Sequence, residues 1–473
     1  MKKTSFSILK KLPMKRIIFF LLILYVGSLT IPYIPHKKVS ESFCKSFSQQ
    51  TFYSDLTGTE RIAYIDDNEE ALLYRLRMIE EANSSIIMST FDFNTDQAGT
   101  DILSALLNAA DRGVSVRIIV DGTSGFLDLQ NNPLFQACVS HENIRIRIYN
   151  PLNLFKPWDI QARLHDKYLI IDRSMYLLGG RNTTNLFLGN YSSSQNIDRD
   201  LYVWEASDSP DSSLNQLLKY FEQIWALEDS KEFTCRKVTE KVNICLEKLH
   251  KHHTALLEKY PKITKNWDWH SLTMETNKIS LLTNPIRTAN KEPWMWYSLH
   301  QLMTGAKEVT IYTPYIICSQ EMYDDLSQLT DKDISVEIIT NDVASGANPW
   351  GCTDYLNQKE KIWSTGVKVY EFMGKNSCHT KAVLLDERMS IIGSYNLDMR
   401  STYQDTELML AVDSDDLNTL IRQEAAKDKT YSKVQEKGDY VYGTNYQAKE
   451  LTLGKKIIYS LLRIVTIPIR RFL

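Results

Sequence analysis

The sequence predicts an α/β protein made of two duplicated α/β/α sandwich domains, related by pseudo-two-fold symmetry and preceded by an N-terminal transmembrane helix. Three observations lead to this fold class. A short motif occurs twice at a constant offset, strand patterns alternate with helical patterns in both halves of the 473-residue chain, and an uncharged apolar run lies near the N-terminus. Alternating strands and helices are typical of a mainly parallel sheet covered on both faces.

The repeated motif has the form H-x-K-x-x-x-x-D. Its first copy runs from His165 to Asp172 and its second from His379 to Asp386, so matching positions are 214 residues apart (379 − 165). A tail follows each copy at the same distance: Gly179-Gly180-Arg181-Asn182 in one half and Gly393-Ser394-Tyr395-Asn396 in the other. One such motif can arise by chance, whereas two in register indicate a duplicated site.

The first element in the chain is the apolar run at 17–34, which carries no charge and approaches the ~20 residues that a bilayer core requires. More basic residues precede it than follow it, which keeps the N-terminus cytoplasmic and the rest of the chain on the extracytoplasmic side. The run is not followed by a small-x-small site, so an uncleaved anchor is favoured over a signal peptide. The flanking basic residues are Lys2, Lys3, Lys10, Lys11, Lys15 and Arg16 before the run, and Lys37 and Lys38 after it.

The two halves repeat one plan of strands and helices. In the first half, the spacing of Leu72, Leu76 and Ile79 predicts a helix over 69–82, and 114–120 is a predicted strand. The strand predicted at 334–340 is its counterpart in the second half. The other predicted elements are strands at 85–93, 144–149, 164–171, 175–178, 201–204, 279–282, 308–317 and 366–370, and a helix at 101–110.

Two segments fall outside this plan. Residues 207–277 are rich in Lys, Glu and Ser and predict a helical linker, in which His250, His252 and His253 are expected at a solvated helix end rather than at a metal site. The C-terminal stretch 457–473 is apolar but contains three arginines and Pro468, so we expect it to lie at a membrane interface. A terminal helix docked on the core is the alternative. The expected units are a cytoplasmic basic segment (1–16), a transmembrane anchor (17–35), a connector (36–58), a first domain (59–206), the linker (207–277), a second domain (278–425) and a C-terminal region (426–473).

The motif residues suit chemistry at a phosphodiester. On a strand, His165 and Lys167 would project from the same face, whereas Asp172 would not share it. One imidazole can attack phosphorus while the other protonates the leaving alkoxide. The expected ligands of the non-bridging oxygens are Lys167, Lys381, Asn182 and Asn396, with His165 and His379 as the reacting pair. Structural roles are assigned to Asp172, Asp386, Gly179, Gly180, Gly393 and Ser394.

Each histidine also needs a carboxylate to hold its second nitrogen. The candidates follow the motifs, in Asp198-Arg199-Asp200 and Asp405-Thr406-Glu407, where Asp200 and Glu407 occupy matching places. We therefore expect Asp200 and Glu407 to be the two partners, with ordinary strand-edge charge as the alternative. Because the motifs bring no carboxylate cluster with metal-ligand spacing, we expect neither a metal nor another cofactor.

Composition narrows the possible partners. A net charge of −3 and a pI near 6.3 provide no basic field, which disfavours nucleic acid as the natural partner. The seven cysteines are scattered and contain no C-x-x-C, so they indicate neither a zinc site nor a disulfide framework. Pairing of Cys235 with Cys245 stays open if the domain faces an oxidising compartment. The oligomeric state is not indicated.

The paired H-x-K-x4-D motifs with their G-[GS]-x-N tails resemble the phospholipase D superfamily over about residues 60–410. More narrowly, the chain resembles bacterial cardiolipin synthases of the C type. This likeness is carried by the stretches 178–182, 338–342 with Ala344, and 392–401, together with the apolar and basic C-terminus. The resemblance implies two phospholipase D-like domains in a protein of the bacterial cytoplasmic membrane.

The resemblance also implies a covalent phosphohistidine intermediate, in which the hydroxyl of phosphatidylglycerol replaces water as the acceptor. Phosphatidylethanolamine is a further candidate substrate. By analogy His165 is the nucleophile and His379 the acid and base, with the reverse assignment open. A phospholipase D that hydrolyses the same bond is the nearest alternative, and a nuclease is disfavoured by the acidic balance and membrane segments. A membrane-tethered scaffold with a dead site would need a broken motif, and both motifs are intact.

Overall fold

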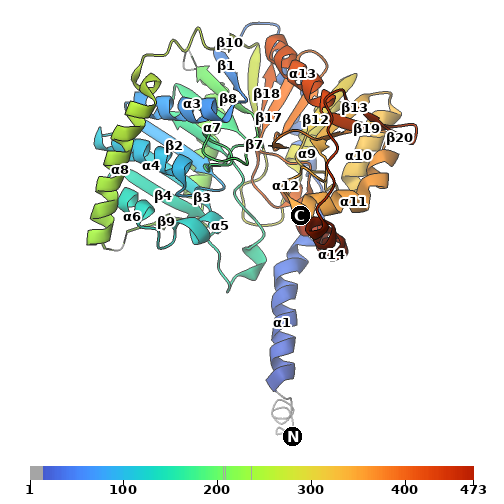
Figure 1. Ribbon diagram of the computed structural model, residues 1–473, viewed down its shortest axis with the longest axis horizontal. Helices are drawn as coiled ribbons and strands as arrows, with labels where there is room; N and C mark the ends of the chain where they lie inside the picture. The colour runs from blue at the N-terminus through green and yellow to red at the C-terminus, as the bar shows by residue number, and fades with distance from the viewer. Residues whose placement is uncertain (1–13, 206, 208, 236) are drawn as a thin grey trace.

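The computed structural model describes residues 14–205, 207, 209–235 and 237–473 (Figure 1). Most of the predicted basic segment, including Lys2, Lys3, Lys10 and Lys11, lies outside the described residues. Two nine-stranded sheets with the same order of equivalent strands form the two halves. The first consists of β10 (Met274–Glu275), β1 (Glu60–Ile65), β8 (Asp200–Glu205), β6 (Met175–Gly179), β5 (Tyr168–Ile171), β2 (Ser85–Thr90), β3 (Ser115–Asp121), β4 (Ile144–Tyr149) and β9 (Ser230–Phe233).

The second sheet follows the same plan, with β11 in the place of β1 and β18 in the place of β8. Its strands are β11 (Lys278–Thr283), β18 (Leu408–Asp413), β17 (Met389–Gly393), β16 (Ala382–Leu385), β12 (Glu308–Tyr312), β13 (Ser335–Asn341), β14 (Lys368–Phe372), β19 (Ser432–Glu436) and β20 (Asp439–Tyr442). The expectation of mainly parallel sheets is wrong. Only β2/β3/β4 and β12/β13/β14 run parallel among the pairs of these two sheets. Short connections such as the one between β5 and β6 can only make antiparallel pairs.

Helices cover the outer faces of both sheets, and two more helices lie in the core that the sheets share. On the first half, α3 (Asn68–Glu81), α4 (Gln97–Asp111), α6 (Pro133–Val139) and α8 (Glu240–Lys259) pack on the outer face. On the second half, α9 (Trp294–Met303), α10 (Gln320–Asp331) and α11 (Pro349–Ser364) do so. The inner faces of both sheets contribute to one apolar core together with α7 (Ser213–Ala226) and α13 (Asp415–Thr430).

The segment expected to be a linker, 207–277, is largely built into the first half. It supplies α7, β9, α8 and β10, because the apolar face of α8 (Val242, Leu249, Leu256) packs on α4 and α6. The three histidines lie inside α8 rather than at its end, and only His250 among them is exposed. His253 is buried, and His252 Nε2 lies 2.6 Å from Asp101 Oδ1.

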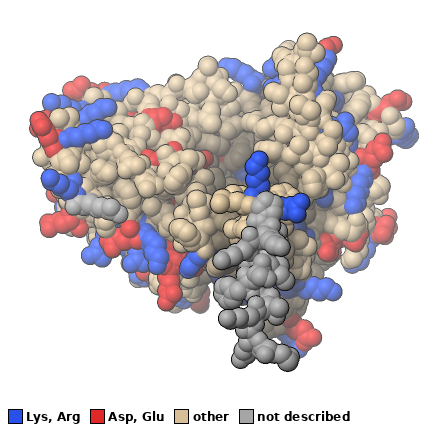
Figure 2. Space-filling model, turned by 90° about the horizontal axis from the view of Figure 1, so that it is seen from below, with Lys and Arg blue, Asp and Glu red and all other residues tan. Residues whose placement is uncertain are grey.

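The N-terminal helix α1 (Met14–Thr30) projects away from the two halves (Figure 1). Residues 14–33 are long and apolar enough to cross a membrane, with a mean hydropathy of 1.8, and none of the most apolar window is buried. Seen from the side of α1, the charged side chains gather mainly on the two flanks of the molecule, and the surface is hollowed between the halves (Figure 2). The C-terminal helix α14 (Leu453–Ile469) lies near the point where α1 meets the protein (Figure 1).

Candidate active site

The two motif histidines lie in extended segments that precede the motif strands. We predicted His165 and Lys167 on a strand that begins at residue 164, but β5 begins only at Tyr168. The reason is that this stretch leaves its own sheet to meet the other half. Leu164 forms an isolated bridge with Thr406, and the His165 amide donates to Thr406 Oγ1 at 3.2 Å.

The second motif is attached to the first half in the same way. The short strands β15 (Ser377–Cys378) and β7 (Asn196–Ile197) pair in parallel, and the His379 amide donates to the Ile197 carbonyl at 2.6 Å. Each motif histidine is therefore held by a segment of the opposite half: His165 by the segment at Thr406, and His379 by β7. This crossed pairing fixes both histidines at the junction of the two halves.

Each histidine contacts a buried carboxylate from the opposite half. His165 Nδ1 lies 2.9 Å from Glu407 Oε1, and His379 Nδ1 lies 2.6 Å from Asp198 Oδ2. The structure thus places Glu407 on a histidine as expected, but it places Asp198, not Asp200, on the other. Asp200 instead forms buried ion pairs with Arg75 at 2.9 Å and Arg181 at 3.2 Å.

Strand register explains why Asp198 and not Asp200 takes this position. Gly179 pairs with Asp200, while its motif counterpart Gly393 pairs with Met409, so β8 and β18 match at an offset of 209 (409 − 200). At that offset the counterpart of Glu407 is Asp198 (407 − 209). Aligning the two segments by their similar sequences instead matches Asp200 with Glu407, at an offset of 207 residues (407 − 200). That alignment is two residues out of register with the strands.

The tail residues shape the surroundings of these carboxylates. A Cβ on Gly180 would lie 2.5 Å from both carboxylate oxygens of Asp198. At the matching position, Ser394 Oγ donates a hydrogen bond to Glu407. A Cβ on Gly179 would clash with the side chain of Asp200, and a Cβ on Gly393 would clash with the Leu408 carbonyl. The neighbouring strand therefore leaves no room for a side chain at either glycine.

The two histidines differ in their electrostatic environment. Burial, and then Lys167, lower the pKa of His165 well below its ordinary value. Burial and Lys381 lower the pKa of His379 to about 4, although Asp198 opposes them. Both imidazoles are therefore neutral at pH 7. Burial raises the pKa of Glu407, whereas for Asp198 the effect of burial is outweighed by Lys381 and His379, which hold its pKa below the usual range.

The lysines lie within the same buried cluster. Lys167 Nζ donates to the His165 carbonyl at 2.5 Å, and burial lowers its pKa to about 7. Lys381 Nζ contacts the ring and carbonyl of His379 and lies 3.5 Å from Asp198 Oδ2. Each lysine also lowers the pKa of the other motif's histidine, although burial contributes most, so the four side chains share one site.

Asn182 and Asn396 are both buried. Asn182 Nδ2 donates to Asp92 at 3.2 Å, and burial raises the pKa of Asp92 to about 6. Within the described part of the chain, neither Asn182 Oδ1 nor Asn396 Oδ1 has a hydrogen-bond partner. Buried amide oxygens without partners are costly, which is consistent with a site that receives a polar ligand.

The motif aspartates lie at the far ends of their strands, with positive φ angles of 50° and 48°. Asp172 accepts backbone hydrogen bonds from Asn83, Ser84 and Ser85, and Asp386 accepts them from residues 307 and 308. Both aspartates therefore hold turns, away from the histidines.

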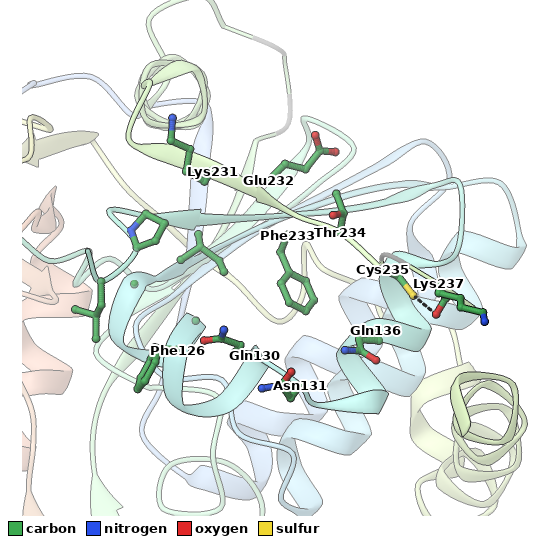
Figure 3. Close-up of a pocket in the computed structure, with 15 residues that line it drawn as sticks. Phe126, Gln130, Asn131, Gln136, Lys231, Glu232, Phe233, Thr234, Cys235 and Lys237 are labelled. Atoms are coloured by element: carbon green, nitrogen blue, oxygen red, sulfur yellow. Dashed lines mark hydrogen bonds between the residues drawn. The ribbon is translucent and has the colours of Figure 1, made fainter. Parts of the chain in front are cut away.

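Other candidate features lie outside this site. A cavity of about 680 Å³ runs along β9, and Phe233 points into it (Figure 3), but neither motif contributes to its lining. Among the described residues, no group of three or more His, Cys, Asp or Glu side chains is placed to hold a metal ion. Cys235 and Cys245 are both free thiols, so the disulfide left open above is not formed.

Two similar sheets, with one His and Lys motif from each meeting at their junction, make this a phospholipase D-like protein. More specifically, the chain belongs to the family described as "Cardiolipin synthase, PLD-like domain", whose model matches residues 76–225 and 299–429.

Individual relatives share about a quarter of their residues or fewer with this chain. Cardiolipin synthase C of Escherichia coli K12 is 23% identical over 399 residues, which cover 76% of this chain and 82% of the relative. An uncharacterized protein of Helicobacter pylori 26695 is 25% identical over 391 residues, which cover 74% and 75%. The crystal structure of phosphatidylserine synthase from Haemophilus influenzae Rd KW20 superposes with a TM-score of 0.61 at 15% identity and covers 90% of this chain and 99% of that one. At that identity the likeness concerns the fold alone.

Proposed function

We propose that this protein is a membrane-bound phosphatidyltransferase that synthesises cardiolipin by transferring a phosphatidyl group to phosphatidylglycerol through a phosphohistidine intermediate. The observation that carries the proposal is the crossed pair of histidines. Each has Nδ1 held by a buried carboxylate of the other half, which leaves Nε2 as the reacting nitrogen of each ring. Lys381 Nζ lies 3.1 Å from Nε2 of His379. Membership of the cardiolipin synthase family supports a phospholipid substrate.

In the first step, His165 Nε2 attacks the phosphorus of the donor lipid. The free protein holds His379 neutral, but the negative charge of the bound phosphodiester and of Asp198 favours its imidazolium. A P–N bond forms as the bond to the headgroup oxygen breaks, and this protonated His379 delivers its proton to that oxygen. In the second step, neutral His379 takes the proton from the acceptor hydroxyl, whose oxygen bonds to phosphorus as the P–N bond breaks. Lys167 and Lys381 stabilise the charge on the non-bridging oxygens in both steps.

The carboxylates favour this assignment of roles. Asp198 is held ionised by Lys381 and His379 despite its burial, so it can stabilise the imidazolium that an acid and base must form. Burial raises the pKa of Glu407, so its partner His165 gains less from an ionised neighbour. A phosphatidyl adduct trapped on His379 rather than His165 would reverse the assignment.

Attachment to a bilayer is supported by the surface around α1. Tyr33, at the end of the candidate span, is buried, and its carbonyl accepts a hydrogen bond from Arg471. On the first half, the loop that contacts α1 exposes Leu154 (71%), Phe155 (91%) and Trp158. On the second half, α14 exposes Leu453, Ile457, Ile458, Leu461, Ile464 and Val465. We propose that α1 spans the cytoplasmic membrane, with the catalytic region on the extracytoplasmic side and α14 at the interface.

Expression in a cardiolipin-deficient bacterium, followed by lipid analysis, tests the proposal. We expect cardiolipin from the intact protein and none from His165→Ala or His379→Ala. A hydrolase would instead raise phosphatidic acid without cardiolipin, and that result would replace the proposed function with a phospholipase D activity.

A further inference from the structure

A second cavity lies between the two halves, next to the histidine pair. Its volume is about 510 Å³, and its lining comes from the segments 193–196, 345–349 and 375–377 and from one face of α14. Its polar lining residues are Ser193, Ser194, Gln195, Asn196, Ser345, Asn376, Ser377, Lys375 and Lys455. Among the described residues that line it there is no Asp or Glu. We refer to this cavity as the serine–lysine pocket.

The strands that carry the catalytic groups also contribute to the wall of this pocket. Asn196 and Ser377 pair with each other in the β7/β15 ribbon, and each lies two residues before a group of the site, Asp198 or His379. At a rise of about 3.3 Å per residue, the wall of the pocket is therefore about 7 Å from the His379 end of the site. The pocket lies on the side of the histidine assigned as the base.

The lining has the chemistry of a site for a phosphate that carries hydroxyl groups. Hydroxyl and amide side chains can exchange hydrogen bonds with a polyol, and two lysines without a lining carboxylate favour an anion. Ile458 and Tyr459 of α14 close one side, and other residues of α14 expose an apolar surface. A lipid molecule could therefore place its headgroup in the pocket and its chains along α14.

We infer that the serine–lysine pocket binds the glycerophosphate headgroup of the acceptor lipid, which rests on the proposed transfer to phosphatidylglycerol. With its phosphate between Lys375 and Lys455, the headgroup glycerol extends about 6 Å, from bonds of about 1.5 Å, and brings its terminal hydroxyl to His379. His379 takes the hydroxyl proton, and the oxygen displaces His165 from phosphorus. Water has no phosphate to bind to the two lysines, so the pocket increases the affinity for the lipid acceptor alone and favours transfer over hydrolysis.

The test compares two acceptors in full-length protein reconstituted in vesicles with a labelled donor lipid. Phosphatidylglycerol needs the pocket, whereas ethanol, which has no phosphate, does not. For Lys375→Gln and for Lys455→Gln, we expect the KM for phosphatidylglycerol to rise about tenfold each, with formation of phosphatidylethanol unchanged. Lys375→Arg should retain most activity. Water-soluble glycerophosphoglycerol should compete with phosphatidylglycerol and lose potency in the double variant.

Lys456→Gln is the matched control, because it removes the same charge from the next position of α14, where Lys456 pairs with Glu450. If Lys456→Gln raises the KM as much as Lys455→Gln, general attraction to the bilayer explains the effect and the inference fails. It also fails if the variants make cardiolipin like the wild type, or if both acceptors are affected equally, since the pocket would then serve the donor. If the wild type forms phosphatidylethanol but no cardiolipin, the proposed function fails and the acceptor site fails with it.

Discussion

Exchanging two neighbouring aspartates for asparagine separates the chemical role of one from the structural role of the other. Asp198 lies 2.6 Å from His379 Nδ1, so Asp198→Asn removes the charge that holds the imidazole and stabilises its protonated form. We expect turnover to fall by about 10²–10⁴-fold. The folded state should lose stability as well, because the substitution leaves the buried Lys381, 3.5 Å away, without its charged partner.

Asp200→Asn should lose stability without a comparable loss of turnover. Its carboxylate is fully buried between Arg75 and Arg181, whose side chains are 8% and 0% exposed. Removing one partner of such a buried cluster costs about 3–5 kcal/mol, which corresponds to a fall in Tm of about 10 °C for a domain of this size. Activity per folded molecule should change less than tenfold. Thermal unfolding and phosphatidyl transfer at 20–25 °C, measured on both variants, decide the matter. An inactive Asp200→Asn with unchanged Tm, beside an active Asp198→Asn, would refute the assignment by strand register.

Three further predictions address the tail glycine, the motif aspartate and the exposed loop. Gly180→Ala should lower turnover about tenfold or more, because the new methyl group displaces the Asp198 carboxylate, and the variant's Tm should change less than its rate. Burial would raise the pKa of Asp172, but its backbone hydrogen bonds outweigh burial and lower the pKa in the folded state. The charged Asp172 therefore stabilises the fold above the unfolded-state pKa of about 4, and this stabilisation is lost as the pH falls through the folded-state pKa. The stability difference between wild type and Asp172→Asn, followed by denaturant unfolding, should therefore shrink below about pH 4, and a gap that widens there would contradict this. Phe155→Asp should reduce turnover of vesicle lipid about tenfold, whereas Ile244→Asp, at an exposed apolar residue of α8, should not.

Much of the fold and part of the site follow from local sequence patterns. The sequence predicts the apolar helix, the main strands and the two motifs, because hydrophobic periodicity and motif spacing are properties of neighbouring residues. The sheet directions were mispredicted, since alternating strands and helices do not reveal which strands return by short hairpins. The surroundings of His252 and His253 in α8 were also mispredicted, because their partners Asp101 and Glu80 come from α4 and α3.

The sequence by itself determined which residue types the site contains: two histidines and two lysines, repeated at one offset. The tertiary structure decided which carboxylates hold them. Each motif is bound to the opposite half, through Leu164 with Thr406 and through β15 with β7, so no comparison within one half could identify the partners. The choice of Asp198 over Asp200 depends on strand register, and a shift of two residues keeps the same strand face while changing which carboxylate reaches the histidine.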